Sequence, residues 1–157
     1  MKALDRVESW IAEGRLVDTR LPRPTSVDFL RALYHRMGAE SLDTLSGAAE
    51  ELSELIGPAR HYCFVLLDGF GEQALAHLPA KGFLAQQRRV PLRSVFPSTT
   101  AAALASVATA EYPGTHGVTG WWIYLERARL VATTLLFRER FGGKTLDQHG
   151  VRSEEHT

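Results

Sequence analysis

The chain has 157 residues, 45% of them hydrophobic, and its 18 Lys and Arg residues balance 18 Asp and Glu residues. This composition is typical of a globular protein, and the balanced charge gives no indication of a nucleic-acid partner or an acidic membrane surface. No stretch approaches the length of a transmembrane helix, and the charged N-terminus lacks the apolar core of a signal peptide. We therefore expect a cytoplasmic protein. The single cysteine, Cys63, cannot form an internal disulfide, and its apolar surroundings favour a small core residue.

The N-terminal part of the chain, residues 2–56, is predicted to be helical throughout. Apolar residues at helical spacing predict one helix over residues 4–11, a second that Ser26 caps and Gly38 ends, and a third over residues 41–56. Because only short linkers follow these helices, we expect them to pack on the next domain. A separate helical module that recruits a partner protein is the alternative.

An apolar run over residues 64–67 ends abruptly at Asp68 and Gly69. A short apolar run bounded by glycine and charge predicts a buried parallel strand. Asp68 would then lie at the carboxyl end of that strand, where open α/β sheets keep their ligand crevice. Farther along, a short helix is predicted over residues 72–78 and a second strand over residues 88–96.

The segment Phe96-Pro97-Ser98-Thr99-Thr100 leads into an alanine-rich stretch that predicts a helix over residues 101–110. Either Thr99 or Thr100 can cap this helix. A hydroxyl at a helix N-terminus lies among free backbone N–H groups, which suit a phosphate. After the helix, residues 121–125 and 130–137 predict two strands joined as a hairpin.

Three blocks of this sequence resemble the alkaline phosphatase superfamily, and within it the type I phosphodiesterase/nucleotide pyrophosphatase branch. The blocks are Val65-Leu66-Leu67-Asp68-Gly69-Phe70-Gly71, Phe96-Pro97-Ser98-Thr99-Thr100-Ala101-Ala102-Ala103-Leu104, and Pro113 with His116-Gly117. The resemblance covers about the middle third of the chain. It implies an α/β fold with a parallel-sheet, alkaline-phosphatase-like core. Because the family's catalytic domain is considerably longer than this chain, we expect a truncated, N-terminal fragment.

The expected organisation has three regions. Residues 1–57 would form an N-terminal helical segment packed on the core, and residues 58–151 would form the N-terminal part of the catalytic domain. Residues 152–157, Arg-Ser-Glu-Glu-His-Thr, coincide with the translation of a common sequencing-adapter oligonucleotide, so we interpret them as an artefact. A polar, frayed terminus is the alternative.

The resemblance also implies roles for individual residues. By position in the family motifs, Thr100 is the nucleophile, and Asp68 and Thr100 are ligands of one of two divalent metal ions, expected to be zinc. The family's remaining metal ligands lie farther along than this sequence reaches. Gly69, Thr99 and Trp121 fall beside these residues and are expected to contact substrate. The nucleotide pyrophosphatases carry an Asn about where Trp121 lies, so the chain departs from their pattern there.

Without the resemblance, the same residues allow a plainer interpretation. Asp68-Gly69 would indicate a turn, and Thr99 and Thr100 would indicate helix caps. With it, the chemistry is coherent, because a bound Zn²⁺ lowers the pKa of a threonine hydroxyl and a carboxylate suits that ion. Two histidines are interpreted as non-catalytic: His116 is expected to make a structural hydrogen bond, and His149 to be solvated.

The implied function is the hydrolysis of a phosphoric ester through a covalent intermediate, with a small-molecule phosphate ester or nucleotide as substrate. Three other activities of the superfamily remain open, namely phosphomonoester hydrolysis, phosphonate hydrolysis and phosphate-group mutation. A non-catalytic α/β binding module is a further alternative. Against that alternative, Asp68-Gly69-Phe70-Gly71 lacks the spacing of a dinucleotide fingerprint or a P-loop.

Overall fold

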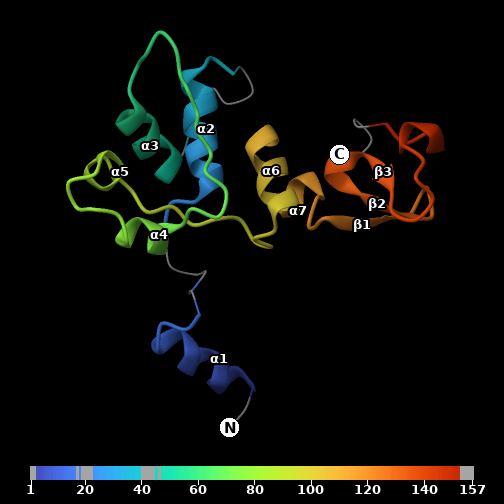
Figure 1. Ribbon diagram of the computed structural model, residues 1–157, viewed down its shortest axis with the longest axis horizontal. Coiled ribbons are helices and arrows are strands. Elements are labelled where there is room, and N and C mark those ends of the chain that lie inside the picture. Colours follow the sequence, from blue (N-terminus) through green and yellow to red (C-terminus); the bar gives the residue numbers. More distant parts are fainter. Residues whose placement is uncertain (1–2, 17, 19–22, 40–44, 46, 153–157) are drawn as a thin grey trace.

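The computed structural model describes residues 3–16, 18, 23–39, 45 and 47–152. Within these residues the chain is a mixture of helices and one small antiparallel sheet. Figure 1 shows α2 to α5 gathered at one end, α6 and α7 in the middle, and the sheet at the other end. Helix α1 (Ala3–Ala12) stands apart from all of these. No described helix combines the length and the apolar character that a membrane span requires.

The predicted N-terminal helices are present, with shifted ends. Helix α1 covers the range predicted for the first helix, α2 spans Ser26–Arg36, and α3 spans Ala48–Ile56. The cap of α2 is Thr25 and not Ser26, because the Thr25 hydroxyl accepts the Asp28 N–H at 3.2 Å while the Asp28 carboxylate accepts the Thr25 N–H at 2.8 Å. Most of the start predicted for the third helix, residues 40–44 and 46, lies outside the described residues.

Helix α2 is the central helix of the N-terminal part of the structure, because both α3 and α6 contact it. It packs against α3 on one side and against α6 (Thr100–Thr109) on another. Its residue Val27 forms a buried cluster with Val95, from the segment before α6, and with Ala102 of α6. The helix that carries the predicted nucleophile is therefore seated on an N-terminal helix.

The two strands predicted for the parallel sheet are not formed. Residues 64–67 belong to no strand, and their side chains are between 40% and 70% exposed. Cys63 is exposed too, so its predicted place in a core is wrong. In the segment predicted as the second strand, Arg93 makes an isolated parallel bridge with Thr25. A strand forms only where a second strand receives its backbone hydrogen bonds, and the described residues offer none to 64–67.

The segments between and after these residues form short helices. Helix α4 (Glu72–Ala76) confirms the short helix predicted there, and α5 (Phe83–Gln86) was not predicted. Helix α6 confirms the alanine-rich helix, and α7 (Pro113–His116) follows it as a single turn. Helices α6 and α7 lie against each other.

The predicted hairpin is confirmed, and it extends into a three-stranded antiparallel sheet in the order β1-β2-β3. Strand β1 (Trp122–Leu125) pairs with β2 (Leu130–Thr133), which pairs with β3 (Arg138–Glu139). Strand β2 ends earlier than predicted, because the chain turns into a 3₁₀ helix, η2 (Thr134–Leu136). A second 3₁₀ helix, η3 (Asp147–His149), precedes the end of the described chain. Residues 153–157, part of the predicted artefact, lie outside it.

Candidate functional site

Asp68, the predicted metal ligand, lies in a tight turn that follows the exposed segment 64–67. Gly69 adopts a φ of +67°, a left-handed conformation that glycine takes at little cost, and the Phe70 N–H donates to the Leu67 carbonyl at 3.3 Å to close the turn. The Asp68 side chain is exposed, and no other described residue binds its carboxylate. Among the described residues, the carboxylate therefore has no partner that would compete with a cation.

Thr100, the predicted nucleophile, is the first residue of α6, and Thr99 is its N-cap. The Thr99 hydroxyl accepts the Ala102 N–H at 3.4 Å, and the Thr99 carbonyl accepts the Ala103 N–H at 2.9 Å. Thr99 therefore has a structural task at this helix end, which confirms one of the two caps predicted from the sequence. The N–H group of Thr100 remains, because the first turn of a helix offers it no carbonyl, whereas Ala101 is fully buried. The Thr100 side chain is exposed beside this N–H group.

The described residues supply only part of a metal site. They contain no group of three or more His, Cys, Asp or Glu side chains arranged to hold one ion. Asp68 and Thr100 come from two separate turns of the chain, and their convergence on one cation stays a prediction. The same holds for the substrate contacts predicted for Gly69, Thr99 and Trp121. Gly69 lines a shallow hollow with Gly71, Glu72 and His77.

Side chains of three residues, two in α2 and one at its N-cap, contact the C-terminal half of α6 and the residues that follow it. The Tyr34 hydroxyl donates to the Val107 carbonyl. The guanidinium of Arg31 donates to the Ala110 carbonyl at 3.0 Å and to the Glu111 carboxylate at 2.8 Å. The hydroxyls of Thr25 and Tyr112 lie 2.9 Å apart. The C-terminal end of the helix that carries the predicted nucleophile is thus held by residues that lie 73 to 87 positions earlier in the chain.

His116 makes the structural hydrogen bonds that the sequence predicted. Its Nδ1 accepts the Val118 N–H at 3.1 Å, and its Nε2 lies 3.0 Å from the Ser106 hydroxyl of α6. A backbone N–H can only donate, so Nδ1 must be unprotonated and Nε2 must carry the proton that is donated to Ser106. The ring is therefore a neutral imidazole that joins α7 to α6.

The electrostatic surroundings of His116 support this neutral form. Burial of the ring lowers its pKa below the ordinary value of 6.5, because a charged imidazolium would lose hydration there. Backbone contacts with Ala102 and with His116 itself, and the negative charge of Glu111, act in the opposite direction but are the smaller causes. His116 is unsuited to gain a charge in the folded chain near neutral pH.

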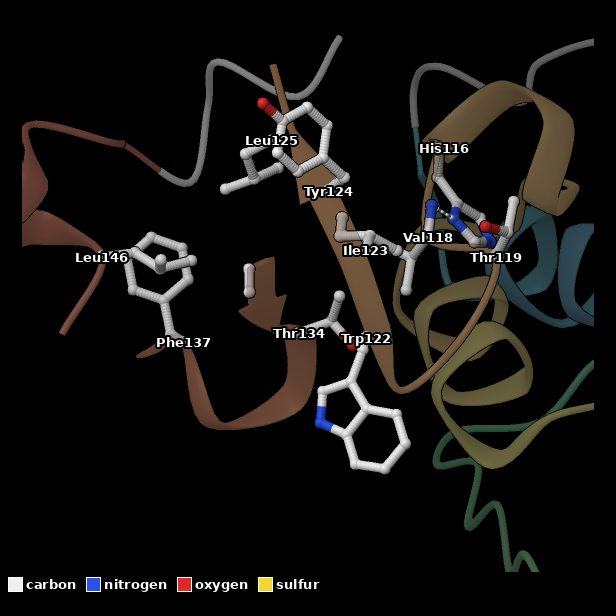
Figure 2. Close-up of a pocket in the computed structure, with 12 residues that line it drawn as sticks. His116, Val118, Thr119, Trp122, Ile123, Tyr124, Leu125, Thr134, Phe137 and Leu146 are labelled. Carbon is white, nitrogen blue, oxygen red and sulfur yellow. Dashed lines mark hydrogen bonds between the residues drawn. The ribbon is translucent and has the colours of Figure 1, made fainter. Parts of the chain in front are cut away.

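A pocket of about 600 Å³ opens between His116 and the hairpin. Figure 2 shows His116, Val118 and Thr119 on one side of it, Ile123 in the middle, and Phe137 and Leu146 on the other side. Its lining is mainly apolar, as is common for ligand pockets. Trp121 precedes β1 with its side chain 40% exposed, and its carbonyl accepts the Thr134 N–H at 3.1 Å.

His149 is not solvated as predicted. Its Nε2 lies 3.1 Å from a carboxylate oxygen of Glu139, and both side chains are mostly buried. The carboxylate of Glu139 also accepts the Lys144 N–H at 3.2 Å and fills the space where a side chain at Gly142 would stand. These contacts order the loop after β3 and show no link to the predicted site.

Two residues that matter for the site were missed from the sequence. Ser106 is 1% exposed, and it is a hydroxyl on an alanine-rich helix, which is a signal that some other polar group must meet it. Arg31 gave no such signal, because an arginine on an amphipathic helix is normally solvated. Its partners, the Ala110 carbonyl and the Glu111 carboxylate, lie about 80 positions farther along the chain, where the end of α6 meets α2.

Comparison with known proteins gives one finding that bears on these residues. Residues 62–134 match the family model of type I phosphodiesterase / nucleotide pyrophosphatase. A search of curated proteins gave no match, and neither did a search of solved structures. The matched range contains Asp68, Thr99, Thr100, His116 and Trp121. The resemblance seen in three separate blocks of the sequence is therefore confirmed by a match of residues 62–134 to the model of the type I phosphodiesterase / nucleotide pyrophosphatase family.

Proposed function

We propose that the protein is a metal-dependent hydrolase of phosphoric esters in which Thr100 is the nucleophile. The observation that carries this proposal is the position of Thr100 within the family match, as an exposed hydroxyl at the first residue of α6. The free N–H group of Thr100 and the positive end of the helix dipole at this place suit the oxygens of a phosphoryl group.

The proposed reaction has two steps. The Thr100 oxygen attacks phosphorus, so a Thr100–phosphorus bond forms while the bond from phosphorus to the leaving-group oxygen breaks, and the departing alcohol takes up a proton. Water then attacks the same phosphorus and releases the Thr100 hydroxyl. The N–H group of Thr100 would stabilise the negative charge on the phosphoryl oxygens in both steps. Thr99 would keep this group in place through its cap.

Divalent metal ions, which we take to be two zinc ions, belong to this proposal, and the described residues fit them incompletely. Asp68 and Thr100 offer two oxygen ligands, whereas a catalytic zinc takes about three from the protein. We propose that residues outside those that the structure describes supply the other ligands. When bound, the metal would lower the pKa of the nucleophile.

The proposed substrate is a small phosphate ester or nucleotide, met in the cytoplasm. Diester hydrolysis is our first choice, because the matched family is named for that activity. Phosphomonoester hydrolysis, phosphonate hydrolysis and phosphomutase chemistry would use the same Asp68 and Thr100 with a different pocket. A non-catalytic binding module would need neither residue.

The test is a turnover assay on the product of the complete gene with added zinc. Bis-p-nitrophenyl phosphate, p-nitrophenyl phosphate and p-nitrophenyl phenylphosphonate report diester, monoester and phosphonate hydrolysis in parallel. We expect the diester to be turned over fastest, with losses of at least about 10³-fold in Thr100→Ala and Asp68→Ala. Thr115→Ala, an exposed threonine of α7, is the matched control and should retain full activity. Equal activity of Thr100→Ala and Thr115→Ala would refute the proposal.

A further inference from the structure

Both ring nitrogens of His116 are engaged in hydrogen bonds while the ring is neutral. Nδ1 faces the Val118 N–H at 3.1 Å, and Figure 2 shows this bond drawn across the short loop between His116 and Val118. A proton on Nδ1 would set one N–H donor against another. The hydrogen bond would then be replaced by a repulsive contact at the same distance.

We propose that His116 is an acid-sensitive latch, which holds residues 113–118 against α6 while the ring is neutral and releases them when Nδ1 takes up a proton. The neutral ring ties three parts of the chain together: α7, which carries it, Val118 in the following loop, and Ser106 on α6. Protonation breaks the Val118 bond directly and puts a charge beside the buried Ser106 hydroxyl, which is 1% exposed.

The groups around the ring decide how readily the latch opens. On the side of α6, the ring meets the Ser106 hydroxyl and the backbone of Ala102. The carboxylate of Glu111 is the charge that favours the imidazolium, and Arg31 engages that carboxylate at 2.8 Å. On the hairpin side, the lining of the pocket contributes Tyr124 as its one titratable group apart from His116 itself. No carboxylate of the pocket lining is available to stabilise a charged ring.

Release would change both the pocket and α6. His116, Gly117 and Val118 form one wall of the 600 Å³ pocket, so the pocket would widen when residues 113–118 detach. Helix α6 would lose its contact with α7 but keep those with α2 through Tyr34 and Arg31. The latch does not depend on any catalytic role of Thr100, so it can be right or wrong independently of the proposed function.

The direct test is a nitrogen-15 NMR titration of the histidines in the 157-residue chain. At pH 7 we expect His116 with its proton on Nε2 and a pKa below the ordinary histidine value of 6.5. The protection of the Val118 amide against hydrogen exchange should fall as the pH is lowered from the ordinary histidine value of 6.5 towards the pKa of His116, by at most about tenfold for each pH unit. A proton on Nδ1 at pH 7, or a Val118 protection that does not change as His116 titrates, would overturn the proposal.

A pair of variants separates the latch from general acid sensitivity. In His116→Asn, the side-chain oxygen can stand near the place of Nδ1 and accept the Val118 N–H, but it cannot be protonated. We expect the protection of Val118 to become independent of pH in this variant and to keep its wild-type pH dependence in the matched control His77→Asn. Retained pH dependence in a folded His116→Asn would refute the latch. Should His116→Asn fail to fold, the titration of the wild-type chain still decides the question.

Discussion

The Nε of Arg31 lies 3.0 Å from the carbonyl oxygen of Ala110, which joins an N-terminal helix to the end of the helix that begins at Thr100. Ala110 is the C-cap of α6 and has a φ of +55°. The carbonyls of a last helical turn have no partner within the helix, and a cationic donor stabilises them through a hydrogen bond and through the helix dipole. A residue outside the matched range 62–134 therefore helps to hold α6 in place.

Replacing Arg31 tests this relationship. Arg31→Ala should lower the free energy of unfolding by about 1–2 kcal/mol, because it removes a charged hydrogen bond to Ala110 together with a partly exposed ion pair to Glu111. Arg31→Lys should lose part of that amount, since lysine cannot bind both partners with one planar group. Urea unfolding is the measurement. Arg127→Ala, an exposed arginine of the hairpin turn, is the control, and an equal effect of both alanine variants would contradict the account.

Gly142 tests the packing of the Glu139 carboxylate. A Cβ at position 142 would stand 1.7 Å from one oxygen of Glu139, so the glutamate must move away from His149 and the Lys144 N–H. We expect Gly142→Ala to cost roughly 1 kcal/mol of stability and to cost nothing in a chain that already carries Glu139→Ala. Gly114→Ala is the control, because its Cβ would meet no atom within 4 Å. Additive effects of the two changes in the double-mutant cycle would show that the contact is unimportant.

The hairpin turn offers a stabilising substitution. Arg129 closes this turn with a φ of +51°, a conformation that costs a residue with a side chain roughly 1 kcal/mol. Its side chain is exposed, so little packing is lost on shortening it. Arg129→Gly should therefore raise the midpoint of thermal unfolding by a few degrees. Arg127→Gly, in the same turn and with no positive φ, should lower it, and the same sign of shift in both variants would contradict the prediction.

The exposed apolar segment 64–67 predicts the solution behaviour of the chain. Val65 is 70% exposed and Leu67 is 50% exposed, and an apolar segment without a strand partner is prone to associate with other chains. The double variant Val65→Glu/Leu67→Glu should aggregate less than the wild-type chain, as light scattering against protein concentration would measure. Its stability should change by no more than about 0.5 kcal/mol, because exposed side chains contribute little. Unchanged aggregation of the variant would show that residues 64–67 do not drive the association, contrary to the prediction.

Elements that depend on neighbouring residues could be predicted from the sequence. The alanines of α6 and its Thr99 cap lie within one stretch, and the hairpin pairs residues that are close along the chain, such as Ile123 and Ala132. A structural hydrogen bond of His116 was expected too, and the structure identifies its partner as the N–H of Val118, two residues away. In each case the sequence pattern and the structure describe the same local interaction.

Elements that depend on distant partners could not be predicted. The apolar run 64–67 has the composition of a buried strand, but pairing requires a second strand, and within the described residues none lies beside it. His149 was interpreted as solvated because no ligand-type residue follows at metal spacing, whereas the loop around Gly142 brings Glu139 back to it. The capping of α6 by Arg31 spans 79 positions and leaves no local pattern.

The role of Thr100 in the proposed reaction can be measured without relying on rates alone. Product of the complete gene would be mixed with bis-p-nitrophenyl phosphate and zinc, quenched with acid within the first turnover, and digested for mass spectrometry. The account predicts a p-nitrophenylphosphoryl group on the peptide that contains Thr100, present in wild-type protein and in Thr115→Ala and absent in Thr100→Ala. Turnover of the substrate with the phosphoryl group on another residue, or with wild-type turnover unchanged in Thr100→Ala, would contradict it.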